Sequence, residues 1–236
     1  EVSDNIAHDL RTPLTRLRNR AEEALAQSGS ETEYRAALER TIDESDGLIR
    51  TFNALLMIAR AESGQARDNM TDFDAADVAQ GIQELYEPLA EDKGLTLAVA
   101  AESAKIHGNR ELVSQALANL VENAIKYGQP GATPLEMAAD GPVNAAKPPD
   151  ILIEARREGS DVLLSVTDHG PGIPEPDRQR AVERFVRLEA SRTQPGSGLG
   201  LSLASAVATL HGGDLRLADS QPGLRVTLVI PSRGVE

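Results

Sequence analysis

Residues 117–127 read Leu-Ala-Asn-Leu-Val-Glu-Asn-Ala-Ile-Lys-Tyr and combine one apolar helix face with one polar face. The apolar face repeats at three- and four-residue steps and consists of Leu117, Leu120, Val121 and Ala124. The polar face carries Asn119, Asn123 and Lys126, and Tyr127 follows directly. Amide oxygens suit Mg²⁺ and a lysine supplies a point charge, so this face could hold a metal-bound phosphate chain. An amphipathic helix whose polar side is only solvated fits the same pattern.

A glycine-rich segment follows a strand pattern further along the chain. Residues 161–167 alternate as a strand does, and Asp168, Gly170 and Gly172 come directly after them. A carboxylate at a strand end can accept a hydrogen bond from an exocyclic amine such as that of adenine, and glycines let the backbone approach a flat ligand. An ordinary strand-ending turn rich in Gly and Pro fits the segment as well.

A second glycine-rich segment, Gly196-Ser197-Gly198-Leu199-Gly200-Leu201, opens the helical pattern of residues 199–210. Backbone N–H groups at the start of a helix can bind phosphate. The segment is not a P-loop, because no Lys-Ser/Thr pair follows, and it lacks the ribose-binding acid of a Rossmann fingerprint. A glycine loop alone is weak evidence for a nucleotide site.

Between these two segments lies a basic stretch, residues 175–195. Its arginines could close over a triphosphate, and they are Arg178, Arg180, Arg184, Arg187 and Arg192. They could equally offset the acidic residues of the same stretch on a solvated helix.

The first part of the chain carries two helical patterns joined by a short turn at residues 28–30. Apolar residues at three- and four-residue steps predict one helix over residues 2–27 and a second that includes Leu38 and ends near Gly64. Two long helices with a short connection form an antiparallel hairpin. Each helix would keep an unburied apolar seam, so we expect two hairpins to dimerise as a four-helix bundle.

His8 lies on the first helix, about 200° around the axis from Ile6, and so points away from the apolar stripe. Asp9 is adjacent, and Thr12 lies one turn further along the same exposed face. Pro13 removes the hydrogen bond that the carbonyl of Asp9 would accept and bends the helix. An exposed histidine beside a carboxylate suggests a nucleophile whose imidazole stays basic. A solvated surface histidine fits these residues too.

The remainder of the chain predicts a mixed α/β unit. Helices are expected over residues 77–91 and 110–126, and strands over 95–100, 151–155, 161–167, 215–217 and 224–230. Residues 129–149 are rich in Pro, Gly and Ala and predict an insertion loop. The expected organisation is a helical domain over residues 1–66 and an α/β domain over residues 70–236, with a polar linker between them.

Composition narrows the function classes. The net charge is −13 and aromatic residues make up 3% of the chain, which argues against direct nucleic-acid binding. The absence of cysteine excludes disulfides and thiolate metal sites. The chain opens inside a helical pattern without Met, so we expect it to be a fragment whose N-terminal part is missing.

The order of these segments resembles that of the sensor histidine kinases. Residues 8–14 (His-Asp-Leu-Arg-Thr-Pro-Leu) resemble the H box of that family and residues 119–127 its N box. Asp168-x-Gly170-x-Gly172 resembles the G1 box, residues 183–185 (Glu-Arg-Phe) the F box, and Gly196-x-Gly198-x-Gly200 the G2 box. The five segments occur in the family's order and span nearly the whole chain.

The resemblance implies a multidomain α and α+β fold, in which a dimerisation and phosphotransfer hairpin precedes a Bergerat-type α/β sandwich that binds ATP. It implies that His8 is the phosphoacceptor, that Asp9 is its general base, and that Thr12 occupies the position that supports dephosphorylation of the partner. We therefore expect a kinase that also acts as a phosphatase on its response regulator.

The resemblance also implies a nucleotide site with ATP and Mg²⁺. Asn123 matches the Mg²⁺ ligand and Asn119 a second contact to metal or phosphate. Asp168 matches the acid that reads adenine. The other implied nucleotide contacts are Lys126, Tyr127, Gly170, Gly172, Phe185, Arg187, Gly196, Gly198, Leu199 and Gly200.

The implied partners are a second copy of the chain, bound through the hairpin, and the receiver domain of a response regulator. The implied location is cytoplasmic, with the membrane reached only through a missing N-terminal region of a bacterial inner-membrane protein. The chain departs from the family pattern in the length of residues 129–149 and in Val182, which stands where the F box usually has an aromatic residue.

Two alternatives remain at this point. An ATPase of the wider Bergerat superfamily would have no need of His8 and Asp9, and it usually has an acid where this chain has Asn119. A non-catalytic dimeric scaffold would have no need of Asn123 and the glycine boxes.

Overall fold

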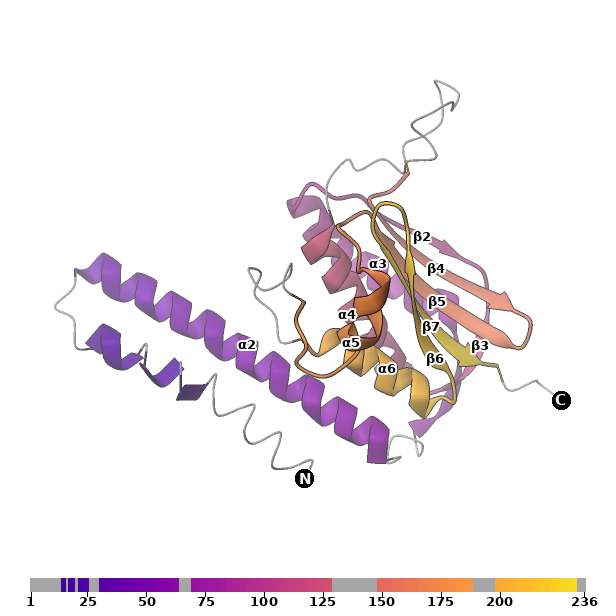
Figure 1. Cartoon of the computed structure of the whole chain (residues 1–236), viewed down its shortest axis with the longest axis horizontal. Coiled ribbons are helices and arrows are strands. Elements are labelled where there is room, and N and C mark those ends of the chain that lie inside the picture. The colour runs from indigo at the N-terminus through magenta and orange to yellow at the C-terminus, as the bar shows by residue number, and fades with distance from the viewer. Residues whose placement is uncertain are drawn as a thin grey trace, which may run out of the picture.

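The computed structural model describes residues 14–15, 17–19, 21–25, 30–63, 69–128, 148–188 and 198–232. Residues 14–15, 17–19 and 21–25 are helical, and the long helix α2 spans Glu31–Ser63. A capping box starts α2: the N–H of Ser30 donates to the Glu33 carboxylate at 2.7 Å, and the N–H of Glu33 donates to the Ser30 hydroxyl at 3.4 Å. This helical region is followed by a mixed α/β domain, as Figure 1 shows.

The α/β domain is built on a five-stranded sheet with the order β2-β4-β5-β7-β6. These strands are β2 (Leu97–Ala101), β4 (Ile151–Glu158), β5 (Asp161–Asp168), β6 (Asp214–Asp219) and β7 (Leu224–Pro231). Only the β2–β4 pair is parallel among the described strands of this sheet. A strand of another sheet and a helix lie between β2 and β4 in the chain, and such a long crossover allows parallel pairing. A separate two-stranded sheet pairs β1 (Thr71–Asp74) with β3 (Lys105–Gly108).

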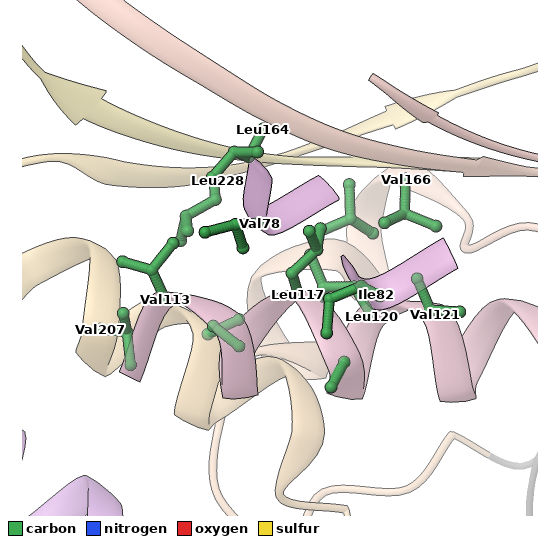
Figure 2. Packing of buried hydrophobic residues seen from close by; sticks show 14 of the residues in the cluster. Val78, Ile82, Val113, Leu117, Leu120, Val121, Leu164, Val166, Val207 and Leu228 are labelled. Carbon is green, nitrogen blue, oxygen red and sulfur yellow. The ribbon is translucent and has the colours of Figure 1, made fainter. Parts of the chain in front are cut away.

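Three helices cover one face of the large sheet, namely α3 (Ala75–Asp92), α4 (Arg110–Tyr127) and α6 (Gly200–Leu210) (Figure 1). A short helix α5 spans Glu175–Ala181. The core fills the space between this helical layer and the strands, and Figure 2 shows Leu117 and Val121 of α4 facing the sheet residues Leu164 and Val166. The two-layer sandwich predicted from the sequence is confirmed.

The helix α2 has two apolar stripes, and they have different surroundings. The stripe that the sequence pattern emphasised stays exposed and comprises Leu38, Ile42, Ile49, Phe52 and Leu56. A second stripe, Leu55, Ile58 and Ala61, is buried and belongs to the core of the α/β domain, where α2 packs against α6. Full burial of a side chain such as Ile58 contributes about 2 kcal/mol, so this contact orders the C-terminal half of α2 on the α/β domain.

Three elements were not predicted from the sequence, namely β1, β3 and α5. The strands have four residues each, too few for an alternating pattern to stand out. Among the described residues, no helix is both long and apolar enough to cross a bilayer.

Candidate functional site

The described residues form a cavity of about 1110 Å³ on the helical side of the sheet. Its walls come from the polar face of α4, the end of β5 with the turn that follows, residues 185–188, the start of α6, and one face of α2. Segments that are far apart in the sequence therefore meet around one space.

The polar face of α4 forms one wall. The helix begins at the N-cap Asn109, whose side chain accepts a hydrogen bond from the N–H of Leu112 at 3.1 Å. The buried apolar face fixes the rotation of the helix, so that Asn119, Asn123 and Lys126 face the cavity. The ammonium of Lys126 donates to the Tyr127 hydroxyl at 2.8 Å and lies 4.6 Å from the centre of that ring.

Asp168 ends β5 and is 8% exposed. Burial raises the pKa of this carboxyl above its ordinary value, and the backbone N–H groups of Gly170 and Leu224 partly offset that effect by donating to it. The N–H of Gly170 donates to Asp168 at 2.8 Å. A buried acceptor held in this way is suited to recognise a single N–H donor on a ligand.

Gly170 does not line the cavity, but it packs against Tyr127, which does. A Cβ atom at this position would collide with the carbonyl of Tyr127, the last residue of α4. The turn after β5 and the end of α4 can therefore approach each other only because residue 170 has no side chain.

The first residues of α6 lie against Asn123, on the polar face of α4. Leu199 is buried, and a Cβ at Gly200 would lie 3.0 Å from the side-chain nitrogen of Asn123. Glycine thus lets the N-terminal backbone N–H groups of α6 come close to Asn123, where they can donate to an anion.

Phe185 and Gly198 meet at the edge of the cavity. The N–H of Phe185 donates to the carbonyl of Gly198 at 3.1 Å. Phe185 has a φ of 61° and Gly198 a φ of 71°, so both residues occupy the left-handed region. Phe185 adopts it at a conformational cost, on the order of 1 kcal/mol, that its packing must offset.

Most of the predicted nucleotide residues line this one cavity. They are Asn119, Asn123, Lys126, Tyr127, Asp168, Gly172, Phe185, Arg187, Gly198, Leu199 and Gly200. The predicted residues His8, Asp9, Thr12 and Gly196 lie outside the described part of the chain.

The contribution of α2 was missed by sequence reasoning. Arg50, Asn53, Met57 and Arg60 of this helix line the cavity. Near its C-terminal end, Glu62 forms an ion pair with Arg184 of the predicted F box. Periodicity reports that α2 has an apolar face but not which element covers it, so no sequence signal pointed to these contacts.

The residues present suit a magnesium–phosphate complex better than an all-protein metal cage. No group of three or more His, Asp and Glu side chains with metal-binding geometry occurs among the described residues. Mg²⁺ is commonly bound through one or two protein oxygens together with substrate phosphates. The amide oxygen of Asn123 can supply such a ligand.

Two family models match the chain. Residues 1–64 match the His Kinase A (phospho-acceptor) domain, and residues 108–234 match the histidine kinase-, DNA gyrase B- and HSP90-like ATPase. Among relatives, the sensor protein IrlS of Burkholderia pseudomallei is 34% identical over 229 residues, which cover 96% of this chain and 45% of the relative. The chain therefore spans less than half the length of that relative.

Solved structures agree with this assignment. The histidine kinase AdeS of Acinetobacter baumannii matches 96% of this chain and 98% of its own with a TM-score of 0.69 at 21% identity, which shows a shared fold. The mycobacterial sensor histidine kinase MprB matches 70% of this chain and 99% of its own with a TM-score of 0.55 at 26% identity. On these matches, the chain belongs to the sensor histidine kinases and contains both their phospho-acceptor domain and their ATPase domain.

Proposed function

We propose that this chain transfers the γ-phosphoryl group of ATP to His8 and then to an aspartate of a response regulator. The observation that carries the proposal is the shared cavity, in which the N-box, G1, F-box and G2 residues face α2. The sequence predicts that α2 forms a hairpin with the helix that carries His8. Phosphoryl transfer depends mainly on positioning and charge neutralisation, and the residues that line this cavity can provide both.

In the first step an imidazole nitrogen of His8 attacks the γ-phosphorus and the bond to the β,γ-bridging oxygen breaks, which releases ADP. Asp9 accepts the proton that the imidazole loses. Asn123 would hold Mg²⁺, which would supply charge neutralisation on the phosphates, and Lys126 adds a second positive charge. Asp168 accepts the hydrogen bond of the adenine amine and so favours ATP over GTP.

In the second step the phosphoryl group passes from His8 to the carboxylate of a receiver domain, and the imidazole is restored. Thr12 supports the phosphatase activity, in which water removes the phosphoryl group from the response regulator. The chain acts as a homodimer through the exposed stripe Leu38, Ile42, Ile49, Phe52 and Leu56, since leaving five large apolar side chains in water would be costly.

The test is incubation with γ-labelled ATP and Mg²⁺, followed by acid and alkali treatment of the protein. We expect label on the protein that is lost in acid and retained in alkali, and no label in His8→Gln or Asn123→Ala. Release of phosphate with no labelled protein would instead indicate a Bergerat-type ATPase, and neither labelling nor hydrolysis would indicate a scaffold. Label that persists in His8→Gln would refute the proposal.

A further inference from the structure

The helices α4 and α6 run antiparallel and touch at both ends. At one end, Gly200 begins α6 against Asn123 of α4. At the other end, His211, which caps the C-terminus of α6, contacts Asn109, which caps the N-terminus of α4. Figure 2 labels Val113 and Val207 on the stretches that lead to this second end, and both side chains are fully buried.

The two hydrogen bonds of the His211 ring fix its protonation state. Its Nδ1 lies 2.7 Å from the carbonyl oxygen of Val207, which can only accept, so Nδ1 carries a proton. Its Nε2 lies 3.0 Å from the backbone nitrogen of Asn109, which can only donate, so Nε2 carries none. The ring is therefore neutral in the Nδ1–H form, and its burial, which lowers the pKa of His211, favours the same form.

The ring has no room to move toward β3. A Cβ atom at Gly108, the last residue of β3, would lie 2.5 Å from both Cδ2 and Nε2 of His211. Gly108 itself is buried. The imidazole thus fills the space where the end of α6, the start of α4 and the small sheet meet, and the absence of a side chain at residue 108 makes that possible.

We infer that His211 is a positioning residue that fixes the axial register of α6 against α4. The bond from Asn109 to Nε2 joins the two helices about 20 Å along α4 from Asn123, which follows from a rise of 1.5 Å per residue. The burial of Val113 and Val207 is a non-directional contribution, whereas a hydrogen bond is lost over a fraction of an ångström. His211 therefore sets where the backbone of Gly200 stands relative to the amide of Asn123.

This inference rests on the proposed function, because the two elements that it aligns are the N-box helix and the G2 glycines of the ATP site. Small displacements between groups that bind one phosphate chain weaken the binding of that chain, because its polar contacts depend on precise placement. His211 itself lies outside the cavity and touches no ligand in this scheme.

The test compares His211→Leu, which loses both ring hydrogen bonds, with His211→Gln, whose side-chain oxygen can still accept from Asn109. ATP binding in the presence of Mg²⁺, the KM for ATP and kcat of autophosphorylation, and Tm are measured on the whole chain. Val162→Ala, a cavity at the far end of β5 from Asp168, serves as a control for lost stability alone. We expect His211→Leu to raise KM about five- to tenfold at nearly unchanged kcat, His211→Gln to restore most of it, and Val162→Ala to leave it unchanged.

A KM in His211→Leu equal to that of Val162→Ala would overturn the inference, whereas absence of ATP binding by the wild-type chain would overturn the proposed function instead. Gly108→Ala, which displaces the ring, should raise KM as His211→Leu does, and an unchanged KM contradicts the inference. If His211→Leu does not fold, ¹⁵N NMR of the wild-type ring decides: a proton on Nδ1 and none on Nε2 at pH 7 supports the inference, and a proton on Nε2 refutes it.

Discussion

The backbone N–H of Phe185 donates to the carbonyl of Gly198 at 3.1 Å, and both residues have left-handed backbone conformations. This pair joins the predicted F box to the predicted G2 box at the edge of the cavity. A Cβ on Gly198 would lie 2.9 Å from the carbonyl oxygen of Val186, so the contact depends on glycine twice, for its φ and for its size.

Gly198→Ala should therefore reduce ATP affinity and autophosphorylation at least about tenfold, because the start of α6 would shift away from Asn123. Isothermal titration with ATP and Mg²⁺ and a labelling assay measure the two effects. Gly212→Ala is the matched control, since Gly212 also has a positive φ of 76° but has open space around its would-be Cβ. Equal losses of affinity in both variants would contradict the role assigned to the Phe185–Gly198 contact.

Asp168→Asn should weaken ATP binding about tenfold or more without lowering stability. Burial raises the pKa of the Asp168 carboxyl, so ionisation of this group destabilises the fold at pH values above that pKa, and the cost is relieved as the pH falls below it. A neutral amide of the same shape avoids this cost and keeps an oxygen for the N–H of Gly170.

Thermal unfolding of the nucleotide-free chain and ATP titration check the two halves of this prediction. Asp161→Asn, at the opposite end of the same strand, should change neither quantity. A lower Tm for Asp168→Asn at pH 7, or undiminished ATP affinity, would show that the buried carboxylate serves the fold rather than the ligand.

Thr12→Ala should abolish dephosphorylation of the phosphorylated response regulator and leave autophosphorylation of His8 intact. The expected separation arises because the hydroxyl one turn beyond His8 is needed to orient water, not to attack ATP. Time courses of regulator dephosphorylation by the two proteins measure it. Thr15→Ala, a hydroxyl change further along the same helix, is the control, and an unchanged dephosphorylation rate in Thr12→Ala would refute the phosphatase role.

Asp74 should make a pH-dependent contribution to stability. Burial alone would raise the pKa of this carboxyl, but donors from Ser103, Ala104 and Ala76 together with Lys105 lower it to about 2. A pKa lowered in the folded state stabilises the fold above the ordinary value near 3.8, and the contribution is lost as the pH falls toward 2.

Urea unfolding of the wild type and of Asp74→Asn at a series of pH values between 7 and 2.5 measures the contribution of Asp74 to the free energy of unfolding. The stability advantage of the wild type should be on the order of 1–2 kcal/mol at pH 7 and shrink below pH 4. A difference between the two proteins that is the same at all pH values would contradict it.

The α/β domain was largely predictable because its elements carry strong periodic patterns. The polar face of Asn119, Asn123 and Lys126 is readable on a helix of eighteen residues, which ends within one residue of the predicted boundary. Asp168 was identified as a strand-ending acid because the apolar residues Val162, Leu164 and Val166 precede it at alternate positions. Their common position in one cavity followed only from the order of the motifs, since pattern alone does not report which elements meet.

The remaining features depend on tertiary contacts between residues with no distinctive local pattern. Leu55, Ile58 and Ala61 are buried by α6, while the apolar residues that marked the helix in the sequence stay exposed. His211 is a lone histidine after a helix, and its bond to Asn109 spans 102 positions along the chain. Neither the element that buries a residue nor the partner of a long-range hydrogen bond leaves a periodic signal that a single sequence can reveal.

The most direct test of the central claim is to locate the phosphoryl group after reaction with ATP and Mg²⁺. The chain has four histidines, His8, His107, His169 and His211. His169 and His211 are engaged with backbone groups inside the fold, and His107 pairs with Asp72. Peptide mapping by mass spectrometry under alkaline conditions should therefore find the phosphoryl group on His8. Phosphate on any other residue, or on none while ATP is bound, would contradict the account.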